Sequence, residues 1–254
     1  KKKFYLTGSP RVDLWKVKFD RIWKNKNLVK KKYILFVSNF GFPNNFYTFR
    51  KIIERKEKEN YYKRSPNLKK EEVKYYYYQK QSMKKFTDLI IKFSKKFPDE
   101  IIYVRPHPTE KVEYWIDNLK NCKNVFIRDK DDLSSYVRNA ECVIQDGCTS
   151  AMESYISDVP VINYQPVKSN NHAFGQFIKK ISINIYNEKN FFKIMKNKKY
   201  KILQNKKHLV NERMTFLDKK LSATKIVNVW IKLFKMSKFL KKKEKNFYNK
   251  NYKI

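Results

Sequence analysis

Residues 142–153, CVIQDGCTSAME, contain an apolar run, a glycine turn and a helix start in direct succession. Positions 142–145 are typical of a buried strand, and Gly147 permits a tight turn after it. Thr149 and Ser150 are residues that favour the first turn of a helix. A strand that passes through a short loop into a helix is the unit from which parallel α/β sheets are built.

The same succession recurs along most of the chain. The apolar run 33–38 predicts a buried strand, and 71–96 predicts a long helix. The pattern then predicts further strands at 101–104, 124–127, 142–145, 160–164 and 181–185, and helices at 110–120, 131–139, 149–157, 188–197 and 208–236. This alternation predicts an α/β fold, a Rossmann-like parallel sheet with helices on both faces.

Basic residues dominate the charge of the chain. Its 254 residues carry a formal net charge of +35, and Lys supplies 50 of the 59 basic residues. Asn, Ile, Tyr and Phe are also abundant, which is typical of an AT-rich genome. Two explanations stay open: codon bias with solvated lysine faces, or selected binding to an anionic surface. We expect no specific nucleic-acid partner.

The remaining composition excludes several classes of site. Cys122, Cys142 and Cys148 lack CxxC spacing, which favours reduced thiols in a cytoplasmic protein over a disulfide framework or a zinc site. No apolar run of about 18 residues and no signal peptide is visible. His172 and His208 lie in polar segments, where solvent-facing roles are common. We expect no metal and no other cofactor.

Three loops follow the predicted strands at what should be one edge of the sheet: 39–45, 105–110 and 146–150. In open α/β sheets, ligands bind outside the carboxyl ends of the strands. Although these loops are far apart in sequence, we expect them to gather on one rim, with Asn39 among the ligand-binding residues.

The loop 146–150 has the features of a phosphate site. Free N–H groups at a helix start and the positive end of the helix dipole favour an anion, so we assign Gly147, Cys148, Thr149 and Ser150 to nucleotide or phosphate binding. Glu153 lies one turn further on, where its carboxylate can accept hydrogen bonds from ribose hydroxyls. The alternative is an ordinary capped helix.

His107 stands between Pro106 and Pro108, which restrict the backbone on both sides of it. A rigid imidazole at a strand end can donate to a phosphate oxygen or transfer a proton, so His107 is the candidate catalytic residue. Arg105 can add charge to the same rim or pair with an acidic neighbour. For Glu110 we expect a role as the cap of the following helix.

The C-terminal segment 232–254 combines dense Lys with Phe, Leu and Tyr. It is either a solvated tail or a basic amphipathic segment that binds an anionic membrane surface. The protein is accordingly expected in the cytoplasm, with a peripheral position on the inner face of the cell membrane as the second alternative.

Five segments together resemble bacterial surface carbohydrate biosynthesis proteins: 7–13, 34–40, 105–110, 146–153 and 158–164. The resemblance extends from about residue 5 to about residue 230. Over this range the chain resembles the C-terminal, nucleotide-binding half of a GT-B glycosyltransferase. Similar halves occur in Kdo transferases, CDP-glycerol glycerophosphotransferases and UDP-GlcNAc 2-epimerases. The His-Pro pair is shared by several of these groups and does not select the base or the sugar.

The resemblance implies a domain organisation. Residues 1–30 would be a connector and entry helix, 31–208 the nucleotide-sugar-binding domain, and 209–254 a C-terminal helix and basic tail. In the family an N-terminal Rossmann-like domain precedes the connector, and we expect it to be absent from this chain. Much of the acceptor site would lie in that half, so this chain would be inactive alone.

The resemblance implies a nucleotide-sugar-dependent glycosyltransferase of capsule or lipopolysaccharide synthesis, which binds a nucleotide-sugar donor and a glycan or lipid-linked glycan acceptor. A UDP-GlcNAc 2-epimerase-like enzyme and a CDP-glycerol glycerophosphotransferase-like enzyme are alternatives. A non-enzymatic polyanion-binding module is the alternative from another class, and its affinity should collapse with salt.

Overall fold

The structure is a computed structural model that describes residues 4–23, 32–63, 65–168, 176–200 and 221–251. The chain forms two compact units. One unit is Val17–Lys206, and the other combines the two ends of the chain, Lys1–Lys16 and Lys207–Ile254. The parallel sheet lies entirely in the first.

Six strands form one sheet in the order β3-β2-β1-β4-β5-β6, and every neighbouring pair is parallel. The strands are β1 (Tyr33–Val37), β2 (Ile102–Arg105), β3 (Val125–Ile127), β4 (Ala140–Gln145), β5 (Val161–Tyr164) and β6 (Ile183–Ile185). This is the doubly wound Rossmann order. The predicted fold class is confirmed.

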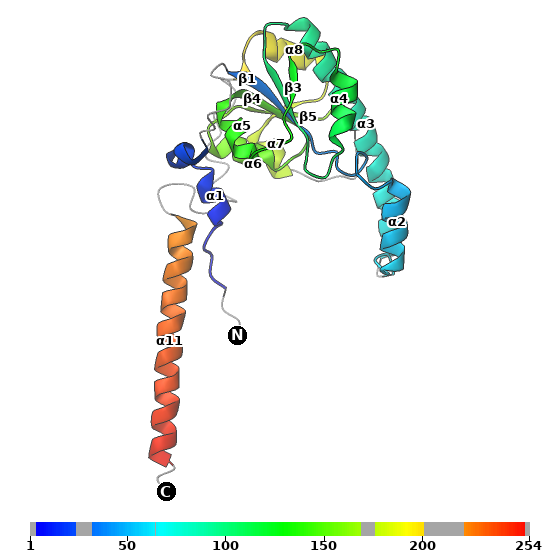
Figure 1. The fold of residues 1–254 in the computed structure, drawn as a ribbon. Helices are drawn as coiled ribbons and strands as arrows, with labels where there is room; N and C mark the ends of the chain where they lie inside the picture. Colours follow the sequence, from blue (N-terminus) through cyan, green and yellow to red (C-terminus); the bar gives the residue numbers. More distant parts are fainter. Residues whose placement is uncertain (1–3, 24–31, 64, 169–175, 201–220, 252–254) are drawn as a thin grey trace. The chain divides into compact units, whose positions relative to one another are not determined.

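Helices cover both faces of the sheet (Figure 1). One face carries α3 (Pro66–Lys96), α4 (Val112–Leu119) and α8 (Glu188–Lys196); the other carries α5 (Leu133–Asn139), α6 (Ser150–Ile156) and α7 (Gln176–Ile181). The main core cluster lies on the first face, where Phe36 of β1 packs edge-on against Phe86 of α3. On the second face, the Tyr33 hydroxyl donates to the Tyr136 carbonyl oxygen at 2.7 Å.

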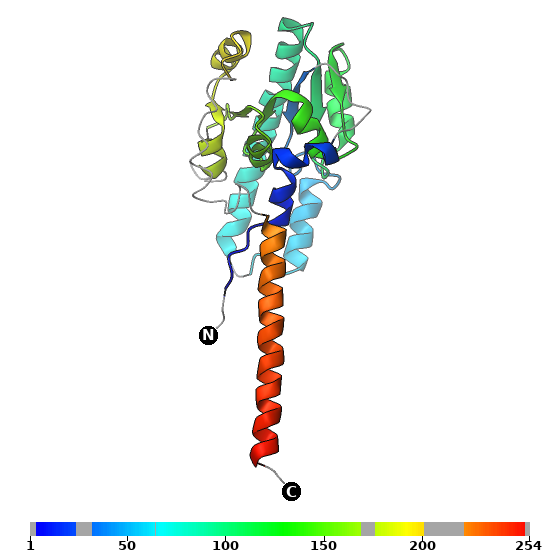
Figure 2. The same ribbon diagram turned by 90° about the vertical axis from the view of Figure 1, so that its left-hand side faces the viewer.

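Among the described residues of this unit, the sequence pattern missed two α-helices. A six-residue helix such as α7 is too short to show a 3.6-residue period. The other is α2 (Phe49–Lys58), which packs antiparallel against the first half of α3 (Figures 1 and 2). The Phe49 and Tyr76 rings stack at 4.0 Å, and Lys56 pairs with Glu72 at 2.7 Å.

The unit formed by the chain ends contains α1 (Pro10–Leu14) and α11 (Ser222–Asn251). Asp13 is buried and caps α11: its carboxylate accepts from the Ser222 hydroxyl at 3.3 Å and from the Ala223 N–H at 3.2 Å. Lys16 pairs with the same carboxylate at 3.0 Å. The predicted helix 208–236 begins outside the described residues, and its described part continues beyond 236.

In Figures 1 and 2, α11 is one continuous helix. Over the described ranges of the chain, we find no helix that combines the length and the apolar character needed to cross a membrane.

Candidate functional site

The candidate site lies at the carboxyl end of the sheet, around its switch point. Val37, the last residue of β1, pairs with Arg105 of β2 on one side and with Gln145 of β4 on the other. The loops that leave these three strands therefore start side by side, which confirms the expected rim. The order of strands reverses between β1 and β4, which is where ligands bind in doubly wound sheets.

The buried side chain of Glu110 connects the loop after β1 with the loop after β2. Its Oε1 accepts hydrogen bonds from the Ser38 hydroxyl at 2.8 Å, the Phe40 N–H at 2.9 Å and the His107 N–H at 3.2 Å. Its Oε2 accepts from the Trp115 indole N–H at 2.8 Å. The Asn44 side-chain amide also donates to Oε2 at 3.5 Å. Glu110 is 1% exposed, so these five donors replace the water shell of its carboxylate.

The expectation that Glu110 caps the next helix is wrong. Helix α4 begins after Lys111, whose side chain makes no capping hydrogen bond. Glu110 instead bonds to residues up to 72 positions away in the sequence. It orients the backbone of His107 and so acts as a positioning residue.

The His107 ring is half-buried and held by its own loop. Its Nδ1 lies 2.8 Å from the Thr109 hydroxyl and accepts from the Thr109 N–H at 3.3 Å. With Nδ1 as an acceptor, the proton of the neutral ring is assigned to Nε2. Gly41 closes the other side of Thr109, because a Cβ at position 41 would collide with the Thr109 hydroxyl.

The loop after β4 is held by a row of buried amides. Gln145 of β4 is in register with Asn163 of β5, and Asn163 with Asn184 of β6. The Asn163 Oδ1 accepts from the Gly147 N–H at 2.9 Å, and the Gln145 Oε1 accepts from the Cys148 N–H at 2.5 Å. The Asn163 Nδ2 donates to the Asn184 Oδ1 at 2.9 Å.

These contacts correct the expectation that the N–H groups of the loop 146–150 are free to bind a phosphate. The N–H groups of Gly147 and Cys148 are already bonded to side chains of the sheet, and the Ser150 N–H donates to the Cys148 sulfur at 3.5 Å. Thr149 is the N-cap residue of α6, but its side chain makes no capping hydrogen bond. The assignment of these four residues to phosphate binding stays a prediction.

Glu153 is buried in the first turn of α6, and the Ser134 hydroxyl of α5 donates to its Oε1. The Ser150 hydroxyl is buried and has no hydrogen-bond partner among the described residues. Glu153 and Ser150 therefore sit under the loop rather than on its outer surface. The proposed contact of Glu153 with a ribose stays a prediction.

Asp146 carries the most perturbed carboxyl group of the rim. Burial raises its pKa to about 7, and a hydrogen bond with Gln165 opposes this rise only in part. Two tyrosines of α3 lie within its field: burial, and then the Asp146 charge, raise the pKa of Tyr75 and of Tyr78, the latter to about 12. A carboxyl group that titrates near neutrality is suited to proton transfer.

Arg105 and Asn39 mainly hold loops in place. The Arg105 guanidinium donates to the carbonyl oxygens of Arg128 at 2.9 Å and Asp131 at 2.8 Å, so its partners are carbonyls and not the acidic side chain that was one alternative. The Asn39 carbonyl accepts from the Gln79 side chain at 3.2 Å. Their roles as phosphate ligands stay predictions.

Within the described part of the chain, no cluster of three His, Cys, Asp or Glu side chains is arranged to hold a metal ion. Cys122 and Cys142 are buried free thiols, and Cys148 is half-buried. His172 and His208 lie outside the described residues.

No protein-family model matches the sequence, and no curated protein matches it. Among solved structures, the chain is similar to the UDP-GlcNAc 2-epimerase of Methanocaldococcus jannaschii in complex with UDP-GlcNAc and UDP. The sequence identity is 19%, the TM-score is 0.51, and the match covers 89% of this chain and 54% of that one. At this identity the likeness shows the fold.

Two structures of a variant of the wall teichoic acid polymerase TagF, one of them soaked with CDPG, also match. They are 16% and 14% identical to this chain, with TM-scores of 0.49 and 0.48. The matches cover 92% and 93% of this chain and 51% and 53% of TagF. The chain thus spans about half the length of the enzymes that it matches.

Proposed function

We propose that this chain is the donor-binding domain of a nucleotide-sugar-dependent glycosyltransferase of the GT-B type, acting in the synthesis of a capsule or lipopolysaccharide. The observation that carries the proposal is the switch-point rim, where the His107 loop and the Gly147 loop follow β2 and β4, the two strands that flank β1. The resemblance of the sequence to surface carbohydrate biosynthesis proteins supports the same function.

In this proposal the donor phosphate lies over the switch point. The His107 Nε2 donates to a phosphate oxygen, because Nδ1 is occupied by Thr109. The loop Gly147–Ser150 contacts the phosphate from the side opposite His107, and Asn39 and Arg105 hold the flanking loops. Glu153 accepts from the ribose after Ser134 releases one carboxylate oxygen.

During transfer, the bond between the sugar C1 and the phosphate oxygen breaks, and a bond from C1 to an acceptor oxygen forms. Negative charge develops on the departing phosphate, where the His107 N–H stabilises it. The acceptor hydroxyl loses a proton in the same reaction. Asp146, with a pKa of about 7, is the group of this rim that we assign to proton transfer.

The test is thermal shift and calorimetric titration with CMP, CDP, UDP and UDP-GlcNAc. A ligand at about 100 times its Kd should add roughly 2.7 kcal/mol to the free energy of unfolding. We expect His107→Ala to weaken nucleotide binding about ten- to a hundredfold, because a hydrogen bond to a charged group contributes about 1.5–3 kcal/mol. Asp117→Ala, an exposed change on α4, is the matched control.

Equal affinity in His107→Ala and Asp117→Ala would refute the proposed rim. Selective binding of UDP-GlcNAc with release of UDP in the absence of acceptor would instead support an epimerase. Nucleotide binding that is unchanged in His107→Ala and is lost at high salt would support the polyanion-binding module.

A further inference from the structure

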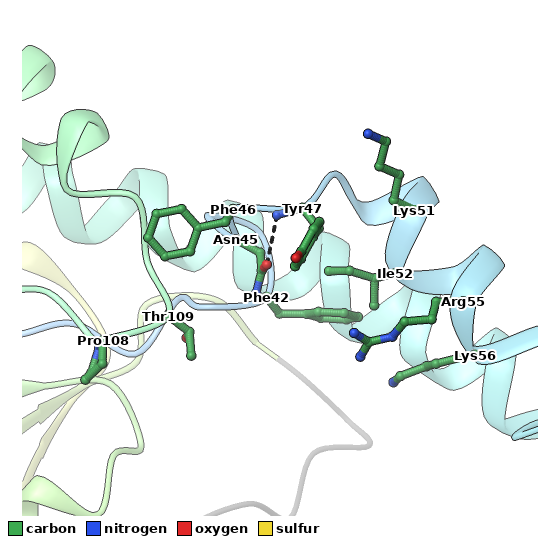
Figure 3. A pocket seen from close by; sticks show the side chains of 10 residues that line it. All are labelled: Phe42, Asn45, Phe46, Tyr47, Lys51, Ile52, Arg55, Lys56, Pro108 and Thr109. Atoms are coloured by element: carbon green, nitrogen blue, oxygen red, sulfur yellow. Dashed lines mark hydrogen bonds between the residues drawn. The ribbon is translucent and has the colours of Figure 1, made fainter. Parts of the chain in front are cut away.

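A pocket of about 680 Å³ lies beside the His107 loop, between the loop Phe42–Tyr47, helix α2 and the residues Pro108 and Thr109 (Figure 3). It belongs to the sheet unit throughout. Its wall includes three basic side chains, Lys51, Arg55 and Lys56, and none of the ten lining residues carries a carboxylate. Its volume is in the range of sites for small organic ligands.

Aromatic side chains form the floor of the pocket. The Phe42 ring packs edge-on against Phe49 at 5.4 Å and against Tyr76 at 5.8 Å, so α2 and α3 hold it in place. Phe46 and Tyr47 are 60% and 61% exposed. The held ring of Phe42 and the exposed rings of Phe46 and Tyr47 favour a ligand with a flat or apolar body.

The basic side chains differ in how far they are already paired. Lys56 bonds to Glu72 at 2.7 Å and is committed to the fold. The Arg55 Nε lies 3.7 Å from Glu59, too far for a hydrogen bond, and Figure 3 shows its guanidinium directed toward the Phe42 ring. The Lys51 ammonium has no ion pair with any residue that the structure describes. Arg55 and Lys51 therefore retain donors for an anion.

The pocket shares a wall with the candidate catalytic residue. Thr109 lines the pocket and also contacts the His107 Nδ1 at 2.8 Å. An isolated bridge between Asn45 and Glu110 ties the two loops together. No residue of 146–153 lines the pocket, so it is distinct from the loop assigned to the donor.

We propose that this pocket binds the acceptor substrate, and that the acceptor is an organic phosphate whose ring or apolar body lies on Phe42 while Lys51 and Arg55 hold its phosphate. The donor would then enter from the β4 side of the rim and the acceptor from the α2 side, and the acceptor hydroxyl would extend from the pocket past His107 to the donor and to Asp146. This assignment rests on the proposed function, since it takes the rim at 146–153 as the donor site.

Phenyl phosphate is the probe, because it joins one ring to one phosphate; phenol and inorganic phosphate test each half. We expect the intact protein to bind phenyl phosphate more tightly than either half. Arg55→Gln and Lys51→Gln should each weaken this binding about tenfold, the effect of losing one charge-assisted contact. Lys58→Gln, on the same helix but outside the pocket, should leave it unchanged. Calorimetric titration measures all four proteins, and their Tm values verify that each is folded.

Nucleotide binding in the same variants separates this inference from the proposed function. Loss of phenyl phosphate binding with retained nucleotide affinity supports a distinct acceptor pocket. If phenyl phosphate fails to bind, or binds equally in Arg55→Gln and Lys58→Gln, the inference is overturned. The inference is also overturned if a nucleotide competes with phenyl phosphate and Arg55→Gln no longer binds that nucleotide, because the pocket is then the donor site. If no nucleotide binds but the pocket variants behave as expected, the proposed function fails while the phosphate site stands.

Discussion

Single residues of the rim combine positioning with chemistry. Glu110 is charged and buried, yet it accepts hydrogen bonds from two loops and a helix. Removing such a group leaves several buried donors without partners, each at a cost of about 1–3 kcal/mol. His107 depends on this arrangement, because its N–H is one of those donors. Glu110 therefore fixes the backbone of His107, while Thr109 holds the imidazole ring.

Asp146 should make stability depend on pH. Its carboxyl pKa rises from 3.8 to about 7 on folding, so the folded state binds a proton more tightly than the unfolded state does. The resulting stabilisation is complete below pH 3.8 and is lost as the pH rises through 7. Relative to Asp146→Asn, the native protein should lose at most about 4 kcal/mol over this interval.

Urea unfolding of the native protein and of Asp146→Asn across this pH range measures the difference. Asp117→Asn, an exposed change on α4, is the control and should follow the native protein at every pH. Parallel curves for the native protein and Asp146→Asn would show that the carboxyl group of Asp146 has an ordinary pKa.

At the scale of elements, the amide row across β4, β5 and β6 holds the loop after β4. Asn163 is completely buried and serves three partners: the Gly147 N–H, the Gln145 side chain and the Asn184 side chain. This row gives the parallel sheet a layer of buried amide side chains near its carboxyl end. The loop Asp146–Cys148 is therefore shaped by the sheet before any ligand arrives.

Asn163→Leu removes this support while keeping the volume similar. We expect a loss of roughly 1–3 kcal/mol in the free energy of unfolding for each partner left without a hydrogen bond, and weaker nucleotide binding because the loop is no longer held. Chemical unfolding and nucleotide titration measure the two effects. Asn118→Leu, on the exposed side of α4, should change stability by less than about 0.5 kcal/mol. Equal stability of the two variants would contradict the role of the amide row.

At the scale of the whole molecule, the excess of positive charge and helix α11 bear on where the protein acts. Trp230 and Phe234 of α11 are 71% and 63% exposed, one turn apart on the same side of the helix. Lysines recur along the same segment, at 225, 232, 235 and 238. The membrane-binding segment was predicted at 232–254, and we propose that it extends toward the start of α11 to include Trp230.

Flotation with vesicles tests this proposal. We expect binding to vesicles rich in anionic lipid at low salt, and loss of binding at about 0.5 M salt, where charges are screened within a few ångströms. The double change Trp230→Ser and Phe234→Ser should reduce binding severalfold, because each ring contributes buried apolar area. Ile116→Ser, an exposed apolar position on α4, is the control. Equal flotation of both variants would exclude α11 as the membrane contact.

Much of the architecture follows from local sequence. Strands β1 to β6 are short apolar runs separated by helical periods, and such a pattern needs only neighbouring residues to be recognised. The same holds for Gly147, which adopts a positive φ of 62°, and for His107 between its two prolines. In a parallel sheet, all loops that follow the carboxyl ends of the strands lie at the same edge, which is why the rim could be predicted.

The partners of the rim residues depend instead on which strands become neighbours and in which register. Glu110 precedes a helix and has the local pattern of a cap, but the pairing of β1 with β2 brings Ser38 and Phe40 to its carboxylate. Gln145 and Asn163 engage the loop N–H groups because β4 and β5 pair in that register. The electrostatic effect of Asp146 on Tyr75 and Tyr78 of α3 likewise joins residues that are far apart in the sequence. The hydrophobic period and turn propensity depend on residues that are close along the chain, so the sequence alone predicts the fold. Hydrogen bonds and desolvation depend on atoms that are close in space, so only the tertiary structure determines the contacts of the rim residues.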